Sequence, residues 1–245
     1  VSALLILAHL LRRKDACRLE VRKLRLHRMA SKRVLMIGIP SGLQNAIFAV
    51  ANLFVQAGLN SFDEITVSGA AAAANADTLV FNILAAFYTA CASFVSRNWG
   101  AGNKERITKT YLISMFYAFA VGSICGGLLL VFGRQFLGLF ADKPEVIDAG
   151  MDRLRIMAFS YGFGSLMDAS IAASRGIGKS IIPTFMVIMG SCVFRVIWIY
   201  TVFAYFHTVP SLYLLYIFSW VITGIAECIY FRYAYKKFVL KAQVW

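Results

Sequence analysis

Charged residues are scarce in this chain. Only 15% of its 245 residues are Asp, Glu, Lys or Arg, whereas hydrophobic residues make up 60% and the mean hydropathy is +0.69. A soluble domain carries about a quarter of its residues as charges and about half as apolar residues. The composition therefore excludes an ordinary soluble domain and indicates a membrane protein.

Acidic residues are scarcer still, with 12 Asp and Glu against 25 Lys and Arg and a net charge of +13. In a soluble protein this surplus would suggest nucleic-acid binding. Beside long apolar runs it instead indicates membrane topology and contact with anionic lipid. We therefore expect membrane lipid, and no nucleic acid, among the partners of this protein.

Histidine and cysteine are too few and too scattered for a metal centre or a disulfide framework. The three histidines lie near the ends of apolar runs, and the five cysteines are an odd number without metal-ligand spacing. No His-Glu-x-x-His or nucleophile motif occurs. We expect no enzyme activity, no metal site and no bound cofactor.

Long hydrophobic runs occupy most of the chain. A membrane-spanning helix needs about 20 mostly apolar residues. The pattern predicts an all-α bundle of six transmembrane helices, near 34–60, 65–95, 107–132, 154–174, 181–206 and 211–231. We divide the chain into the end of a preceding transmembrane helix (1–11), a basic cytoplasmic linker (12–33), a six-helix lobe (34–231) and a basic cytoplasmic tail (232–245).

The positions of Lys and Arg predict the orientation of this bundle. The segments 12–33, 96–109, 175–180 and 232–245 hold 20 of the 25 basic residues and fall at one end of the predicted helices. Basic loops stay on the cytoplasmic side of a membrane. We therefore place these segments in the cytoplasm and 133–152 outside, in a multi-pass protein of the plasma (inner) membrane.

The first predicted helix carries a polar stripe. At about 100° per residue, Asn45, Asn52 and Gln56 fall on one face, and Pro40 loosens the cytoplasmic end of the helix. Lipid does not tolerate such a face. The helix either lines a transport path and bends at Pro40, or its amides hold neighbouring helices together, and the sequence leaves both interpretations open.

Four charged residues fall inside the predicted spans and away from their ends, namely Asp77, Asp168, Arg195 and Glu227. An unpaired charge at the bilayer centre costs at least about 2.5–3.5 kcal/mol, so each should have a partner or a function. Helical rise places Asp77 nearest to Arg195 in depth, and we predict a buried ion pair between them. Glu227 lies close to the cytoplasmic end, where water or the basic rim can neutralise it.

Asp168 shares a helical face with Tyr161 and Ser165. A carboxyl group in an apolar cavity can hold a proton or bind a cation. We predict that these three residues, together with the amide stripe of the first helix, form a coupling-ion or substrate path. A purely structural Asp168 is the alternative.

Three local patterns mark the predicted cytoplasmic ends of the helices. They are Gly38-Ile-Pro40 in the first span, Asn98-Trp-Gly-Ala-Gly-Asn-Lys-Glu-Arg106 after the second, and Ser174-Arg-Gly-Ile-Gly-Lys-Ser-Ile-Ile-Pro183 after the fourth. We expect a helix hinge at Pro40 and turns at Gly100, Gly102, Gly176 and Gly178. With these patterns at these intervals, the chain resembles the C-terminal half of a transporter of the MATE (multidrug and toxic compound extrusion) family.

The resemblance implies a twelve-helix transporter of two six-helix lobes, with this chain as the second lobe and an N-terminal six-helix lobe as its partner. It implies secondary active efflux of amphipathic, cationic small molecules by antiport with H⁺ or Na⁺, with alternating access between the lobes. Some members bind the coupling cation through carboxylates on the first and fourth helices of this lobe. This chain has no acid on its first predicted helix, so the coupling acid can lie in the other lobe instead.

Two other functions stay open. A flippase for lipid-linked oligosaccharides, from the same wider superfamily, would need a strongly cationic cavity, and Arg195 is the one basic residue deep in the predicted spans. A non-transporting structural membrane subunit is the other alternative, because one lobe alone cannot form a two-lobed path.

Overall fold

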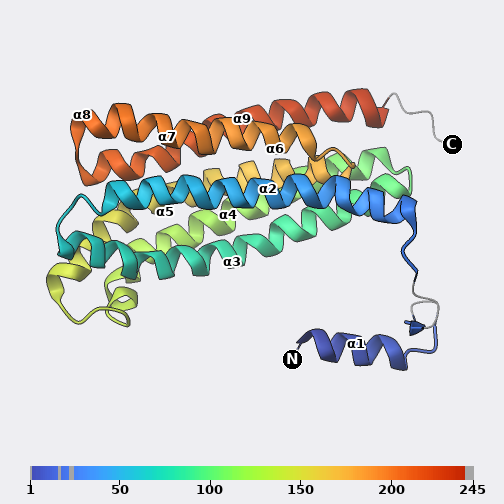
Figure 1. Cartoon of the computed structure of the whole chain (residues 1–245), viewed down its shortest axis with the longest axis horizontal. Helices are drawn as coiled ribbons and strands as arrows, with labels where there is room; N and C mark the ends of the chain where they lie inside the picture. Colours follow the sequence, from blue (N-terminus) through green and yellow to red (C-terminus); the bar gives the residue numbers. More distant parts are fainter. Residues whose placement is uncertain (1, 16–17, 22–24, 241–245) are drawn as a thin grey trace. The chain divides into compact units, whose positions relative to one another are not determined.

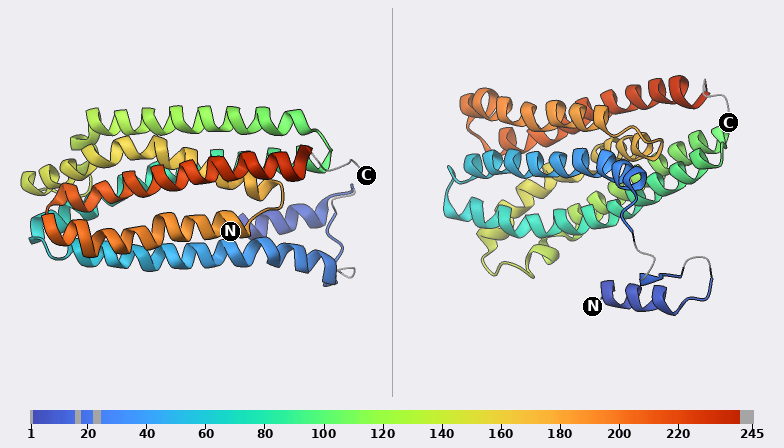
Figure 2. Two further views of the ribbon diagram at one scale, coloured as in Figure 1. Left: turned by 90° about the horizontal axis from the view of Figure 1, so that it is seen from above. Right: turned by 45° about the vertical axis from the view of Figure 1, so that its right-hand side comes forward.

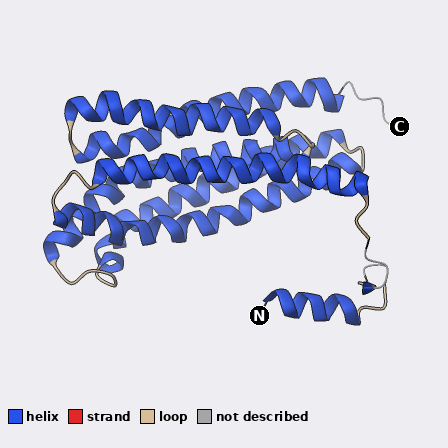
Figure 3. Ribbon diagram, viewed as in Figure 1, coloured by secondary structure: helices blue, strands red, loops and turns tan. Residues whose placement is uncertain are grey.

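The computed structural model describes residues 2–15, 18–21 and 25–240, and no strand forms among them (Figures 1 and 3). The chain divides into two compact units, Val1–Met36 and Ile37–Trp245. The smaller unit contains helix α1 (Ser2–Arg12) and a turn in which the Arg13 guanidinium pairs with Asp15. Positions 16–17 and 22–24 of the predicted linker and 241–245 of the predicted tail lie outside the described residues, and the predicted segment boundaries stay predictions.

The larger unit is a bundle of long helices, which confirms the predicted all-α membrane fold. Its long α-helices are α2 (Arg28–Leu59), α3 (Glu64–Gly100), α4 (Lys104–Leu137), α5 (Pro144–Gly176) and α9 (Val209–Ala234). Of α2, the part from Ile37 onward belongs to this unit. A π-helical turn, η4 (Tyr235–Leu240), extends α9. Between α5 and α9 runs one helical segment made of α6 (Ile181–Val187), η2 (Ile188–Val193), α7 (Phe194–Trp198), η3 (Ile199–Phe203) and α8 (Ala204–Phe206).

Five described helices are long and apolar enough to cross a membrane, namely α2, α3, α4, the segment Ile181–Phe206 and the segment Val209–Leu240. They correspond to five of the six predicted spans. The other predicted span, 154–174, lies within α5, a helix of 33 residues that begins at Pro144 and carries several charges. Neighbouring helices cover much of the surface of α5, so this helix can carry more polar residues than one that faces lipid. Its composition therefore does not mark it as a membrane span.

Helix α5 forms the core of the bundle, where it packs against α3, α4 and α9 (Figure 2). Small residues let the backbones approach closely, as membrane helices require. A Cβ atom added at Gly126 of α4 would collide with the carbonyl oxygen of Ala158 on α5. One added at Gly69 of α3 would lie 2.6 Å from the carbonyl oxygen of Val146. Close backbone contact therefore fixes α5 against both helices.

Two π-helical stretches, η2 and η3, flank the short helix α7 that carries Arg195. Such stretches add a residue to the helical turn and occur often at functional sites. Gly190 of η2 lies directly against α9, since a Cβ atom there would come 2.5 Å from Thr223 Oγ1. This contact holds the irregular segment against α9.

Three of the predicted cytoplasmic segments meet at one end of the bundle. Lys104 Nζ donates to the Leu240 carbonyl at 3.2 Å, and the Tyr235 hydroxyl donates to the Lys104 carbonyl at 2.9 Å. Lys179 Nζ lies 3.7 Å from the centre of the Phe238 ring. These loops therefore share one side of the bundle, as their charge predicts, and which side of the membrane they occupy stays a prediction.

The glycines of these loops have different roles. Gly102 and Gly178 have φ angles of 70° and 77°, which glycine adopts at low cost, and their turn role stays a prediction. Gly176 ends α5 against α3, because a Cβ atom there would lie 2.7 Å from Val95 Cγ1. Gly100 ends α3 with open space around its Cα.

At the opposite end, the turn after α2 contacts the turn after α8. Ser61 Oγ and His207 Nε2 lie 3.4 Å apart, and the Phe62 ring stacks on the His207 ring. Asp63 precedes α3, and the Thr66 hydroxyl donates to its carboxylate at 2.6 Å. This hydrogen bond holds the pKa of Asp63 below its ordinary value.

Candidate functional site

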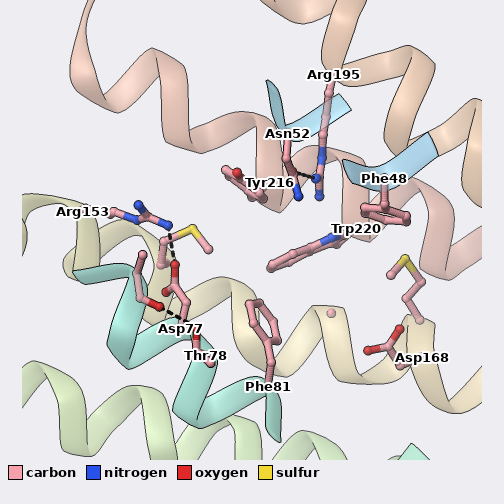
Figure 4. Close-up of a pocket in the computed structure, with 14 residues that line it drawn as sticks. Phe48, Asn52, Asp77, Thr78, Phe81, Arg153, Asp168, Arg195, Tyr216 and Trp220 are labelled. Atoms are coloured by element: carbon pink, nitrogen blue, oxygen red, sulfur yellow. Dashed lines mark hydrogen bonds and ion pairs between the residues drawn. The ribbon is translucent and has the colours of Figure 1, made fainter. Parts of the chain in front are cut away.

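A cavity of about 380 Å³ lies among α2, α3, α5, α7 and α9 (Figure 4). Its volume is within the range of small-molecule binding pockets, about 300–1,000 Å³. Its polar lining residues are Asn52, Asp77, Thr78, Arg153, Asp168 and Arg195, and its large apolar ones are Phe48, Phe81, Met157, Met167, Tyr216 and Trp220. The cavity therefore combines aromatic surface with two acids and two guanidinium groups.

Asp77 pairs with Arg153, not with Arg195 as predicted. The Arg153 guanidinium donates to one carboxylate oxygen of Asp77 (Figure 4). The Tyr161 hydroxyl donates to the other oxygen. The Asp77 and Arg153 side chains are only 8% and 13% exposed. The predicted Asp77–Arg195 pair is therefore wrong. Arg153 reaches from α5 to α3 and forms the ion pair with Asp77 instead.

Arg195 is almost fully enclosed, with 1% of its surface exposed. Nη1 donates to Asn52 Oδ1 at 2.9 Å. The guanidinium carbon lies 4.4 Å from the centre of the Tyr216 ring, 5.1 Å from that of Phe48 and 5.8 Å from that of Trp220. Cation–π contacts of this kind stabilise a buried cation, but Nε and Nη2 have no hydrogen-bond partner among the described residues.

Asp168 lines the same cavity, as its proposed role in a path requires (Figure 4). Its carboxylate makes no hydrogen bond or ion pair with any residue in the described part of the chain. Arg175 is the basic residue whose charge acts on it. The Arg175 guanidinium, however, donates to Tyr88 and to Gln44.

Tyr161 and Ser165 do not join Asp168 at one polar spot, although all three lie on α5. Tyr161 donates to Asp77, and Ser165 donates to the Gly162 carbonyl at 2.7 Å. Neither lines the cavity. The shared helical face therefore did not predict the contacts of Tyr161. Its hydroxyl donates to the Asp77 carboxylate on the neighbouring helix α3 instead.

The amide stripe of α2 contributes one residue to the cavity. Asn52 lines it, whereas Asn45 and Gln56 are exposed away from it. Gln56 Nε2 donates to Asn60 Oδ1 at 2.8 Å. Pro40 lies inside α2 without ending the helix, and its hinge role stays a prediction.

Glu227 differs from its predicted environment. Its side chain on α9 is fully buried, and both carboxylate oxygens lack a hydrogen-bond partner among the described residues. It was expected to meet water or the basic rim. The expectation is wrong because distance along α9 predicts only how deep Glu227 lies in the membrane. It does not predict that α5 and the segment after it enclose the side chain.

The sequence interpretation missed Arg153 and the aromatic residues Tyr216 and Trp220. Arg153 was assigned to the outer loop side, since the predicted span began at 154. The signal that could have placed it is Pro144, a residue suited to the first helical turn, after which α5 continues without a break. Among the described residues, no group of three or more His, Cys, Asp or Glu side chains could hold a metal ion.

Comparison with known proteins identifies the family. The MatE family model matches residues 40–201, about two thirds of the chain. The chain belongs to the MatE family. It is 27% identical over 130 residues to the probable multidrug resistance protein YpnP of Bacillus subtilis, covering 53% of this chain and 29% of that protein. It is 23% identical over 163 residues to the probable multidrug resistance protein NorM of Thermotoga maritima, covering 63% and 33%.

Solved structures of MATE transporters share this fold. A multidrug resistance MATE family transporter in an outward-facing conformation superposes with a TM-score of 0.87 at 19% identity, covering 98% of this chain and 54% of that one. A MATE transporter complexed with MaD3S gives 0.86 at 19% identity, with the same coverage. The chain thus spans about half the length of the solved MATE transporters, as one lobe does, and the relatives are transporters.

Proposed function

We propose that this chain is one lobe of a two-lobed MATE exporter in the plasma (inner) membrane, with its basic loops in the cytoplasm. With an N-terminal six-helix lobe, it exports amphipathic small molecules that carry a positive charge. Export is driven by H⁺ or Na⁺ moving inward, and access to the cavity alternates between the two sides of the membrane. Membership of the MatE family and the half-length match support this proposal.

The observation that carries the proposal is the Asp168 carboxylate. It lines a cavity of about 380 Å³ beside aromatic side chains, and no hydrogen bond or ion pair joins it to another residue in the described part of the chain. An unpaired carboxylate at membrane depth is a functional group by default, because its burial is costly. Such a group can bind a substrate cation and a coupling ion in turn, which is the requirement of antiport.

The charge of the cavity does not favour the flippase alternative. Two aspartates, Asp77 and Asp168, balance two arginines, Arg153 and Arg195. A pyrophosphate-carrying lipid would call for a surplus of cationic groups.

The proposal is tested with Asp168→Asn in proteoliposomes that contain the two-lobed protein and an imposed H⁺ or Na⁺ gradient. The substitution keeps shape and hydrogen-bonding capacity but removes the charge. We expect binding of a dye cation such as ethidium to weaken by about tenfold, in line with loss of a hydrogen bond to a charged group, and gradient-driven efflux to fall at least as much. Asp142→Asn, at an exposed acid in the turn before α5, is the matched control and should transport normally.

Two results would contradict the role of Asp168. Wild-type efflux from Asp168→Asn at equal protein amount would move coupling to the other lobe. Loss of expression with normal efflux per surviving molecule would make Asp168 a structural residue.

A further inference from the structure

A second cavity, of about 630 Å³, lies between α4 and α9. Both helices pack against α5, and Phe163 and Leu166 of α5 line the cavity between them. Trp220 separates it from the charged cavity, since its ring lines both. Two lining residues of α9, Ile225 and Ile229, are 57% and 64% exposed. The cavity is therefore an apolar groove, here called the α4–α9 groove, that opens at the surface of the bundle.

The α4–α9 groove has the length of one leaflet of a membrane. Along α9 and η4 its lining runs from Trp220 to Tyr235, fifteen residues later, which is about 22 Å at 1.5 Å per residue. One leaflet with its headgroup region is about 20–22 Å thick, half of a bilayer. Tyr235 lies at the basic end of the bundle, because its hydroxyl donates to the Lys104 carbonyl. The groove thus extends from the middle of the bundle to its basic end.

The polar atoms in the wall of the groove are satisfied within the protein. The Tyr111 hydroxyl lies 2.9 Å from Ser170 Oγ and donates to Cys228 Sγ at 3.5 Å. Ser170 Oγ in turn donates to the Leu166 carbonyl at 2.9 Å. No lining residue of the groove has a buried side-chain donor or acceptor without a partner in the described part of the chain. A polar ligand would lose its own hydrogen bonds there, so the groove favours a hydrocarbon chain.

One charged side chain, that of Arg232, lines the groove. It is exposed, and no hydrogen bond or ion pair joins it to another described residue. The acid of the nearby first turn of α4, Glu105, is already paired with Lys109. This end of the groove therefore complements an anionic headgroup, whose phosphate matches the guanidinium fork. The first turns of α4 and the turn η4 are basic as well, with Lys104, Arg106, Lys109, Lys236 and Lys237.

We propose that the α4–α9 groove binds one anionic phospholipid of the surrounding membrane, with an acyl chain between α4 and α9 and its phosphate on Arg232. This inference goes beyond the proposed function and does not depend on it. The acyl chain fills the apolar part of the groove, and the guanidinium selects the anionic headgroup. The lipid occupies space that α4 and α9 leave open over α5, at a distance from the polar groups of the charged cavity.

The test is native mass spectrometry of the purified two-lobed protein in detergent, titrated with phosphatidylglycerol or with phosphatidylcholine of the same acyl chains. Both lipids supply the chains, and only phosphatidylglycerol carries a net negative charge. We expect one phosphatidylglycerol to bind about fivefold to tenfold more tightly than phosphatidylcholine, the effect of a basic side chain on an anionic lipid. Glycerol phosphate, which has the anionic group without the chains, should not displace it.

Variants assign the two contacts. Arg232→Gln should abolish the preference for phosphatidylglycerol at one site, and Arg232→Lys should retain most of it. Ile229→Trp places an indole ring at an exposed lining position and should abolish retention of both lipids at that site, and Ile225→Trp should do the same. The controls are Lys236→Gln and Ile222→Trp, at exposed positions that do not line the groove. Both controls should bind lipid as the unaltered protein does.

Four results would overturn the proposal. Equal binding of the two lipids to the unaltered protein would show that no headgroup is selected. Equal losses in Lys236→Gln and Arg232→Gln would show a diffuse effect of charge. Unchanged binding in both tryptophan variants of the groove would place the acyl chain elsewhere, and displacement by glycerol phosphate would assign Arg232 to a free anion. Because the readout is lipid binding, a failure of gradient-driven efflux would reject the proposed function and leave this measurement standing.

Discussion

At the scale of the residue, the bundle neutralises its buried charges by unequal means. Asp77 has both an arginine and a tyrosine as partners, whereas Arg195 has one amide and three aromatic rings. Asp168 and Glu227 have no hydrogen-bond partner among the residues described. Pairing stabilises a fold, and unpaired groups are available for ligands. Asp168 lines the cavity and Glu227 does not, so we propose a structural role for Asp77 and keep the functional role proposed for Asp168.

A double-mutant cycle tests the structural pair. Arg153→Gln should lower the free energy of unfolding by about 3–5 kcal/mol, because it leaves the Asp77 carboxylate buried and without its charge partner. Adding Asp77→Asn should recover part of that loss, which thermal unfolding in detergent measures. The cycle of Asp77→Asn with Arg195→Gln is the control and should be additive. Additivity in the first cycle and coupling in the second would restore the pair that depth alone predicted.

At the scale of the element, close backbone packing explains why α5 tolerates its charges. Glycines on α3 and α4 bring those helices against α5, so that polar residues in its middle, such as Ser160, Ser165 and Ser170, are buried against protein. The same helix carries Arg153 toward α3 and Asp168 toward the cavity. The positions of the charged groups thus depend on the fit of helix against helix.

Two adjacent glycines of α4 provide a direct test of that fit. Gly126→Ala should lower the free energy of unfolding by about 1–3 kcal/mol, because the added methyl group meets the backbone of Ala158. Gly127→Ala meets nothing within 4 Å and should be neutral or stabilising by about 0.5–1 kcal/mol, since alanine favours the helix. Thermal unfolding of the two variants side by side gives the comparison. Equal effects would show that α4 and α5 are not in close contact.

The sequence was sufficient for most of the elements and insufficient for their contacts. Long apolar runs and turn glycines predicted the helices, since length and composition decide whether a helix can span a bilayer. The partner of Asp77 depends on which helix faces which, and a long arginine side chain reaches across from α5. Enclosure of Glu227 also depends on the neighbours of α9. Periodicity along one helix contains neither kind of information.

At the scale of the whole bundle, the two ends differ in chemistry. Lys104, Lys179 and the last turn at Leu240 meet at one end, while Ser61 and His207 meet at the other. A shared end is what a membrane topology requires of these basic loops. The positive-inside rule predicts that this end faces the cytoplasm.

Single-cysteine labelling tests this orientation. Asn103→Cys lies in the turn between α3 and α4, and Lys143→Cys lies in the turn before α5, both at exposed positions. In a cysteine-free background, a membrane-impermeant maleimide should label position 143 in intact cells and position 103 only after the membrane is opened. Because the two positions lie at opposite ends of α4, they must label from opposite sides if α4 spans the membrane. Labelling of position 103 alone in intact cells would invert the bundle, and the proposed direction of transport would reverse with it.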